Sequence, residues 1–164
     1  MLFKTISYIK FLLRSTNQHG LHSPFVYNFV NKGLYSKEIK NNILSEYSEL
    51  KKLSKKEQTV FSKIIAYFKT NQLYIDVKSS NKSEDQEYKI IYVNTIHKIQ
   101  SSELNTFNTK DIIVIYGIHQ QKKTALKWQE IIKSKEAKVT IDLFYFGLIF
   151  FRKEQVKEHF NIRV

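Results

Sequence analysis

The stretch Ile112-Ile113-Val114-Ile115-Tyr116 is an unbroken run of apolar and aromatic residues, and a second run of this kind occupies residues 89–93. Short runs rich in β-branched residues are typical of strands that are buried on both faces of a sheet. Strands of that kind are usually parallel and are covered by helices on both sides. The two runs therefore predict the centre of an α/β sheet.

The segments on either side of these runs extend the same pattern. Residues 73–77 form a further short strand, and residues 78–88 are a polar, charged connection from it to the next run. Residues 121–135 have apolar side chains at helical spacing, among them Trp128 and Ile131. We therefore expect strands that alternate with a helix.

The C-terminal part of the sequence predicts a hairpin. Residues 139–143 and 148–151 are apolar runs that flank a short connection. After the hairpin we expect a last helix around residues 154–159 and then an extended piece over residues 161–164. The chain would thus end on antiparallel strands rather than on another crossover helix.

The N-terminal segment has the pattern of an amphipathic helix. Its basic residues Lys4, Lys10 and Arg14 lie on other faces than a stripe of four apolar residues, which are Leu2, Ile6, Ile9 and Leu13. Basic helices of this kind bind anionic membranes in some proteins. We expect the commoner outcome, in which the helix covers its own domain.

Further helices are predicted before the first strand. One begins at Pro24, which suits the first helical position, with Ser23 as its cap and an end towards Gly33. Residues 36–70 contain neither glycine nor proline and predict two helices divided near Ser54. This order predicts an α/β fold in a single domain over residues 1–164, with a helical cap over residues 1–70 and a sheet over residues 71–164.

Composition narrows the classes of function. The 164 residues are 42% hydrophobic, which is enough for a packed core. Because the chain has no cysteine, disulfides, thiolate metal sites and thiol nucleophiles are excluded. The lack of cysteine leaves the redox compartment undetermined, and we expect a cytoplasmic protein by default. His19 and His22 make a poor metal site without a nearby carboxylate, so we expect a structural role for them and no metal.

The net charge of +12 raises the question of an anionic partner. The only arginines are Arg14, Arg152 and Arg163, and all other basic residues are lysines. Base reading and bidentate phosphate recognition favour arginine, so we prefer a solvated lysine surface to a binding site for RNA or for an anionic membrane.

Two segments carry a resemblance to a known family. Residues 19–30 (HGLHSPFVYNFV) and residues 139–164 (VTIDLFYFGLIFFRKEQVKEHFNIRV) closely resemble Bacteroidetes proteins classed as class I S-adenosylmethionine-dependent methyltransferases. Residues 111–135 resemble the family less closely, and residues 73–108 do so only in outline. The resemblance implies a reduced Rossmann-like sheet that ends in an antiparallel hairpin, with S-adenosylmethionine bound at the carboxyl ends of the strands.

The first cofactor motif of that family is altered here. Asp76 matches its acidic residue, but Lys78 stands where the first glycine belongs, and there is no glycine between residues 34 and 116. A nucleotide can approach the backbone closely only where glycines line the turn. The connection over residues 78–88 is also too short for the usual crossover, so a strand–helix–strand unit is missing.

The acids at the next two strand ends are missing as well. Where the family has Asp-Gly-x-His, Asn94 begins Asn-Thr-Ile-His and only His97 is retained. Where it has Asp-Asp-x-His, Tyr116 begins Tyr-Gly-Ile-His and only His119 is kept. Carboxylates that would bind a metal or act as a base are thus absent from both positions.

These losses predict a degenerate methyltransferase-like protein. We expect it to be non-catalytic and to bind no cofactor. The candidates for lining its degenerate pocket are Asp76, Asn94, His97, Tyr116 and His119. One alternative is a residual S-adenosylmethionine-dependent methyltransferase, and another is a basic binding module for RNA, the ribosome or an anionic surface. A third is a scaffold that forms a homo-oligomer or binds a protein partner through exposed aromatic residues, namely Tyr145, Phe146 and Phe151.

Overall fold

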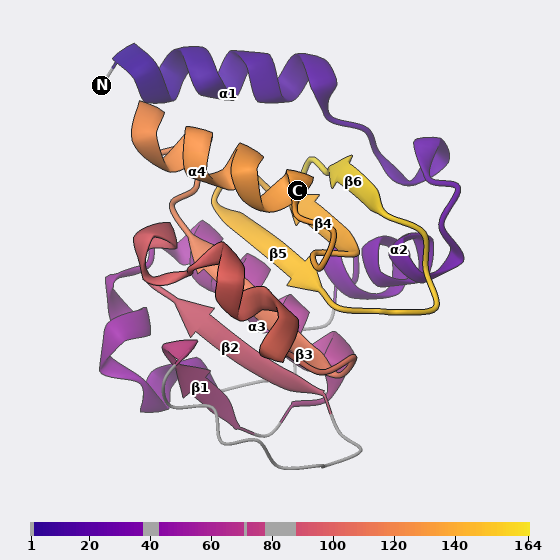
Figure 1. The fold of residues 1–164 in the computed structure, drawn as a ribbon. Coiled ribbons are helices and arrows are strands. Elements are labelled where there is room, and N and C mark those ends of the chain that lie inside the picture. The colour runs from indigo at the N-terminus through magenta and orange to yellow at the C-terminus, as the bar shows by residue number, and fades with distance from the viewer. Residues whose placement is uncertain (1, 38–42, 71, 78–87) are drawn as a thin grey trace. The chain divides into compact units, whose positions relative to one another are not determined.

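The chain forms two compact units, which Figure 1 traces from end to end. The residues that the computed structural model describes are 2–37, 43–70, 72–77 and 88–164. The first unit, Met1–Ser15 with Leu73–Arg163, contains the sheet, and the second is Thr16–Gln72 with Val164. The expected α/β class, with helices preceding a sheet, is confirmed.

Six strands form one mixed sheet in the order β1-β2-β3-β5-β4-β6. Their bounds are β1 (Leu73–Ile75), β2 (Lys89–Val93), β3 (Asp111–Tyr116), β4 (Val139–Asp142), β5 (Phe146–Phe150) and β6 (Glu158–Asn161). Strands β1, β2 and β3 pair in parallel, β5 is antiparallel to both β3 and β4, and β6 is parallel to β4. Every strand except β5 therefore ends at the same edge of the sheet.

The central strands are as the apolar runs predicted. All five residues of β2 and the first five of β3 are buried, as expected of strands covered on both faces. The sequence left open whether the first two strands are neighbours, and they are, with Leu73 opposite Ile90. The connection between them lies mostly outside the described residues.

The C-terminal hairpin is confirmed, with β4 and β5 paired directly. Its turn contains Phe144, which has the left-handed backbone angle φ 68° that bulky residues seldom adopt. The Asp142 side chain supports this turn, since its Oδ1 accepts a hydrogen bond of 2.8 Å from the Phe144 amide. Phe146 and Phe151 are buried in the sheet region, so the expectation that they are exposed contact residues is wrong. Tyr145 is half-buried.

Helix α4 (Lys122–Lys133) confirms the helix predicted from residues 121–135 and packs against the sheet (Figure 1). Its Trp128 is fully buried in a cluster of aliphatic side chains from the strands, among them Ile113, Ile115 and Ile149. Gly147 of β5 lies below the indole, and a Cβ there would stand 2.9 Å from a ring carbon of Trp128. This contact explains why the second residue of β5 is a glycine.

Helix α1 (Leu2–Arg14) forms as predicted, but the predicted apolar stripe is not the face that packs. The helix is held by Phe11, which is buried and lies 5.5 Å from Phe144 between ring centroids. The stripe is exposed instead, with Leu2 at 76% and Leu13 at 82% of full exposure. Helix α1 belongs to one compact unit with the sheet, as expected of a helix that covers its own domain, but it packs through the face that contains Phe11 and not through the apolar stripe.

The predicted C-terminal helix is absent from the described residues 154–159, and this expectation is wrong. Residues Glu158–Asn161 form strand β6 instead, with Val139 opposite Glu158. In the next pair of residues along these strands, Thr140 Oγ1 lies 2.9 Å from His159 Nδ1. Strand β6 thus pairs with the edge of β4 through its backbone N–H and C=O groups. In a helix, these groups would have been hydrogen-bonded within the segment itself.

The second unit is helical. It contains α2 (Pro24–Asn28), a π-helical turn over Phe29–Leu34 and α3 (Lys55–Phe68). Helix α3 begins with a capping box, in which the Ser54 hydroxyl accepts from the Glu57 amide and the Glu57 carboxylate accepts from the Ser54 amide. The ring of Phe29 packs against α3, 5.2 Å from the ring of Phe68.

Helix α2 begins at Pro24 with Ser23 at its N-cap position, and the helical path ends at Leu34, next to the predicted stop at Gly33. Two local expectations for this unit are wrong. The Ser23 side chain makes no capping hydrogen bond to α2. The first of the two helices predicted over residues 36–70 is replaced, in its described part, by short 3₁₀ turns at Ile43–Glu46 and Ser48–Lys52. Helix α3 corresponds to the second.

Candidate functional site

The parallel strands bring most of the predicted site residues to one edge of the sheet. Asp76 follows β1, Asn94 follows β2, and Tyr116 is the last residue of β3. Asp142 and Asn161 end β4 and β6 at the same edge. In open α/β sheets the carboxyl ends of parallel strands are where ligands bind.

At the β1 end of this edge, the Asp76 side chain is already engaged by the protein. Its Oδ2 forms an ion pair of 2.6 Å with Lys98 Nζ, and its Oδ1 accepts a hydrogen bond of 2.7 Å from the Val77 amide. The backbone of Asp76 has φ 77°, and its amide donates to the Tyr92 carbonyl at 2.8 Å. The carboxylate is therefore fixed by its neighbours at the point where the chain leaves β1.

The next three predicted residues do not form one cluster. Asn94 and His97 are exposed. Tyr116 is half-buried, and its ring lies 5.8 Å from the ring of Phe146. His119 lies further along the edge, where its hydrogen-bond partners are residues that were not among the predicted site residues.

His119 is brought there by a tight turn after β3. Gly117 has φ 73°, and its amide donates to the Tyr145 carbonyl at 2.9 Å. A side chain would be strained at this φ, and a Cβ would come within 2.6 Å of the Gln120 side chain. Glycine at position 117 therefore allows the chain to turn sharply towards β4.

The two ring nitrogens of His119 have different partners. Nε2 lies 2.6 Å from Asp142 Oδ2, and Nδ1 lies 2.8 Å from the Ser7 hydroxyl of α1. The ring stacks on Phe144 with 9° between the planes and 5.1 Å between centroids. Both the orientation and the hydrogen bonds of the imidazole are thus defined.

Asp142 is the buried anchor of this arrangement. The residue is 2% exposed. Besides His119, its carboxylate accepts hydrogen bonds from Trp128 Nε1 at 3.2 Å and from the Phe144 amide at 2.8 Å. A carboxylate can only accept, so His119 Nε2 carries a proton that it donates to Asp142. In the neutral tautomer that this contact selects, Nδ1 is free of a proton and accepts from the Ser7 hydroxyl.

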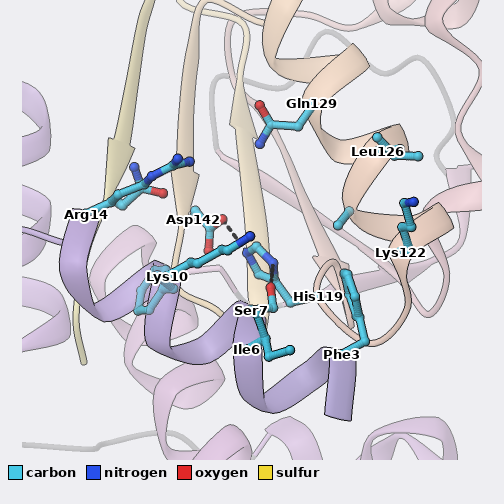
Figure 2. Close-up of a pocket in the computed structure, with 13 residues that line it drawn as sticks. Phe3, Ile6, Ser7, Lys10, Arg14, His119, Lys122, Leu126, Gln129 and Asp142 are labelled. Atoms are coloured by element: carbon cyan, nitrogen blue, oxygen red, sulfur yellow. Dashed lines mark hydrogen bonds and ion pairs between the residues drawn. The ribbon is translucent and has the colours of Figure 1, made fainter. Parts of the chain in front are cut away.

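A pocket of about 240 Å³ opens beside Ser7, His119 and Asp142. It lies between α1, α4 and the ends of β4 and β6. Figure 2 shows Ser7 on α1 and Lys122, Leu126 and Gln129 on the facing helix. Its apolar lining includes Phe3, Ile6 and Leu126, and its basic side chains are Lys10, Arg14 and Lys122. The pocket thus combines apolar surface with three cations.

A second histidine lies close to the same edge. Burial lowers the pKa of His159, although the nearby Asp142 charge and a hydrogen bond with Asn161 act in the opposite direction. Its ring meets Trp128 edge-on at 6.2 Å. Burial therefore favours the neutral form of the His159 side chain.

Of the residues in this pocket, the sequence identified only His119. Asp142 carried a usable signal, since it is an acid that ends a predicted strand at the carboxyl edge. Ser7 carried none, because its position on α1 falls outside the apolar stripe that defined the helix. His19 and His22 are both exposed. Within the described ranges, no group of three or more metal-binding side chains occurs.

No family model, no curated protein and no solved structure matches this chain. Of the helices in the described part of the chain, none has both the length and the apolar character needed to cross a membrane. Its function must therefore be inferred from its own residues.

Proposed function

We propose that this protein is a shortened relative of the class I S-adenosylmethionine-dependent methyltransferases that has lost methyltransferase activity and no longer binds the cofactor in the manner of that family. The observation that carries the proposal is the 2.6 Å ion pair between Asp76 and Lys98. By the resemblance, Asp76 is the acidic residue of the first cofactor motif. Here its carboxylate is neutralised by a side chain of the same protein.

The backbone around this residue supports the proposal. A nucleotide held at the end of the first strand needs glycines that let the main chain come close. The chain has no glycine from residue 34 to residue 116, which includes the whole connection between β1 and β2. Residues with side chains thus occupy every position where the family uses glycine.

The sheet order gives further support. Strand β1 lies directly beside β2 and pairs with it in parallel, with no other strand between them. The antiparallel β5 lies between β3 and β4, in line with the hairpin that the resemblance implies. This combination fits a methyltransferase-like sheet that has lost a strand–helix–strand unit from its cofactor-binding half.

Isothermal calorimetry with S-adenosylmethionine and S-adenosylhomocysteine tests the proposal. We expect no saturable heat at ligand concentrations up to about 1 mM, which corresponds to binding weaker than about −4 kcal/mol. Lys98→Ala, which releases Asp76, should not restore binding because the glycines are still missing. Saturable micromolar binding that is lost in Asp76→Asn would establish a residual methyltransferase site and overturn the proposal.

A second function, attachment to an anionic lipid surface, is favoured by the exposed face of α1. Leu2, Ile6, Ile9 and Leu13 all lie on it, and even the least exposed of them, Ile6, is 43% exposed. Helices with an apolar face and basic flanks lie in the membrane interface, where buried apolar area and attraction to anionic lipids both contribute.

The charge distribution favours lipid as the occupant of this face. Helix α1 contains Lys4, Lys10 and Arg14 and no acidic residue, and the first acid in the sequence is Glu38. Each cation near an anionic leaflet contributes about 1 kcal/mol of attraction. A protein partner for this face would need its own acidic rim, whereas a leaflet of anionic lipid supplies negative charge along the whole helix.

Co-sedimentation with vesicles tests this second function. We expect binding to phosphatidylcholine vesicles that contain phosphatidylglycerol, weaker binding to pure phosphatidylcholine, and a decrease with added salt. Leu13→Glu should abolish binding, whereas Val156→Glu should not, because Val156 is 76% exposed but lies outside α1. Equal binding of both variants, or binding to RNA with none to vesicles, would exclude the lipid surface as the ligand of α1.

A further inference from the structure

The hydrogen bonds of His119 connect three groups in the order that nucleophilic catalysis requires. Ser7 has the place of the nucleophile, His119 that of the base, and Asp142 that of the acid that orients the base. A serine hydroxyl is activated when a neutral imidazole accepts its proton and a carboxylate holds the other ring nitrogen. Ser7 Oγ lies 2.8 Å from His119 Nδ1, and His119 Nε2 lies 2.6 Å from Asp142 Oδ2. Both distances fall in the range that proton transfer requires.

The burial of these residues differs in the way that such a site needs. Asp142 has a side chain that is 3% exposed, and that of His119 is 13% exposed. Ser7 is half-buried and lines the pocket of about 240 Å³. The acid is therefore shielded from water, while Ser7 lies beside His119 on the wall of a pocket that is large enough for a small acyl group (Figure 2).

Three cations line the pocket that Ser7 also lines. Lys10 and Lys122 line the same pocket as Ser7, from α1 and from the first turn of α4, and Arg14 lines it as well. Ammonium groups stabilise the oxyanion of an acyl-transfer intermediate and also attract an anionic substrate. The apolar Phe3, Ile6 and Leu126 provide surface for the uncharged part of that substrate.

From this geometry we infer that Ser7, His119 and Asp142 form a hydrolytic site for carboxylic esters that combine an apolar part with a negative charge. Ser7 Oγ forms a bond to the ester carbonyl carbon, its proton passes to His119 Nδ1, and the carbon–oxygen bond to the alcohol breaks as that alcohol takes the proton. Water then attacks the acyl-serine and gives a proton to His119. Ser7 regains that proton as the carboxylic acid leaves. Asp142 is a positioning residue, because it contacts His119 and not the substrate.

This site is separate from the proposed loss of the cofactor. Its residues belong to α1, to the turn after β3 and to the end of β4, whereas Asp76 follows β1. Ester hydrolysis at Ser7 and cofactor binding at Asp76 are therefore measured independently, and either result leaves the other unchanged.

Covalent labelling tests the nucleophile directly. We expect a fluorophosphonate probe to modify Ser7, as seen by peptide mass spectrometry of the labelled full chain. His119→Gln should prevent the modification, whereas Ser102→Ala, an exposed serine in the 3₁₀ segment Ser101–Thr106, should not change it. An unlabelled Ser7 in folded protein, or labelling that persists in His119→Gln, overturns the inference.

Hydrolysis of two esters of similar size tests the substrate class. We expect 4-nitrophenyl hemisuccinate, which is anionic, to be cleaved with a higher kcat/KM than neutral 4-nitrophenyl butyrate, and Lys10→Gln to reduce this preference. Ser7→Ala should lower kcat for both by at least about 100-fold. A rate that Ser7→Ala leaves unchanged would overturn the inference, and a rate equal for both esters would overturn the charge assignment.

The role of Asp142 has its own readout. Asp142→Asn, measured where its circular dichroism equals that of the parent, should lower kcat with little change in KM, because it disturbs the imidazole and not the substrate contacts. A change in KM alone would contradict the positioning role.

Discussion

Asp76 and Asp142 are equivalent in their place on the sheet but differ in their surroundings. Each stands at the carboxyl end of a parallel strand, β1 for Asp76 and β4 for Asp142. The Asp76 side chain is 28% exposed and pairs with the exposed Lys98, whereas the Asp142 side chain is 3% exposed and is held by His119. The comparison shows that position on the edge is not enough to define a site, because burial and fixed partners decide what a carboxylate does.

The difference has a physical origin in what covers each end. Around Asp142 the indole of Trp128 and the ring of Phe144 exclude water, and Trp128 Nε1 and the Phe144 backbone amide donate hydrogen bonds to the carboxylate. Interactions of a charge are strong in such surroundings and weak near bulk water. We therefore expect the contacts of Asp142 to contribute more to stability than the Asp76–Lys98 pair.

The largest expected effect comes from Asp142→Asn. The amide cannot accept from all three donors, so at least one buried donor among Trp128, Phe144 and His119 loses its partner. We expect the free energy of unfolding, measured with urea, to fall by about 2–4 kcal/mol. A loss of less than about 1 kcal/mol would show that the network contributes no more than an exposed pair.

Gly147→Ala should have the next largest effect. The new Cβ would lie 2.9 Å from one Trp128 ring carbon and 3.1 Å from an Ile118 methyl carbon. Because both neighbours are fully buried, we expect overpacking to cost about 1–3 kcal/mol in urea unfolding and to weaken the support of Asp142. Unchanged stability would mean that the indole moves freely, contrary to a fixed β4 end.

A smaller effect should appear as a dependence on pH. Burial lowers the pKa of His159 from 6.5, so the unfolded chain binds a proton more readily than the folded one. Stability should therefore be highest above pH 6.5 and fall as the pH drops through the window below 6.5 towards the lower folded pKa. In urea unfolding, His159→Gln should reduce this fall and His97→Gln, at an exposed position, should not. Equal slopes in both variants would contradict the buried role of His159.

The smallest effect is expected from Asp76→Asn, the counterpart of the first substitution. Asparagine tolerates the left-handed backbone at this position, where φ is 77°, and its side-chain oxygen can still accept from the Val77 amide. The ion pair with the exposed Lys98 is lost, and pairs near bulk water contribute little, so we expect a change below about 1 kcal/mol in urea unfolding. A cost equal to that of Asp142→Asn would remove the contrast between the two ends.

The sequence predicted the parts of the fold that have a strong periodic signal. The apolar runs of β2 and β3, the hairpin and α4 each follow from the spacing of buried residues. Strand β6 was missed because its four residues, Glu158–Asn161, are only partly buried and show no alternation. The exposed face of α1 was missed for a related reason, since an apolar stripe indicates a helix but not what that stripe contacts.

The candidate site was less predictable because its partners are distant in sequence. His119 is 23 residues from Asp142 and 112 residues from Ser7, and no local pattern joins them. By contrast, Asp76 and Asn94 were selected from their places after strands, and the fold does bring them to the predicted edge. Only the tertiary structure shows which strand ends are neighbours and which side chains are buried. These two properties distinguish the pocket residues from Asp76 and Asn94.

The most direct test of the central claim is a crystal structure of the full chain grown with excess S-adenosylhomocysteine. We predict that the Asp76–Lys98 ion pair is retained and that no ligand density lies against the ends of β1, β2 and β3. A molecule of S-adenosylhomocysteine seated there, with Lys98 displaced from Asp76, would contradict the loss of cofactor binding.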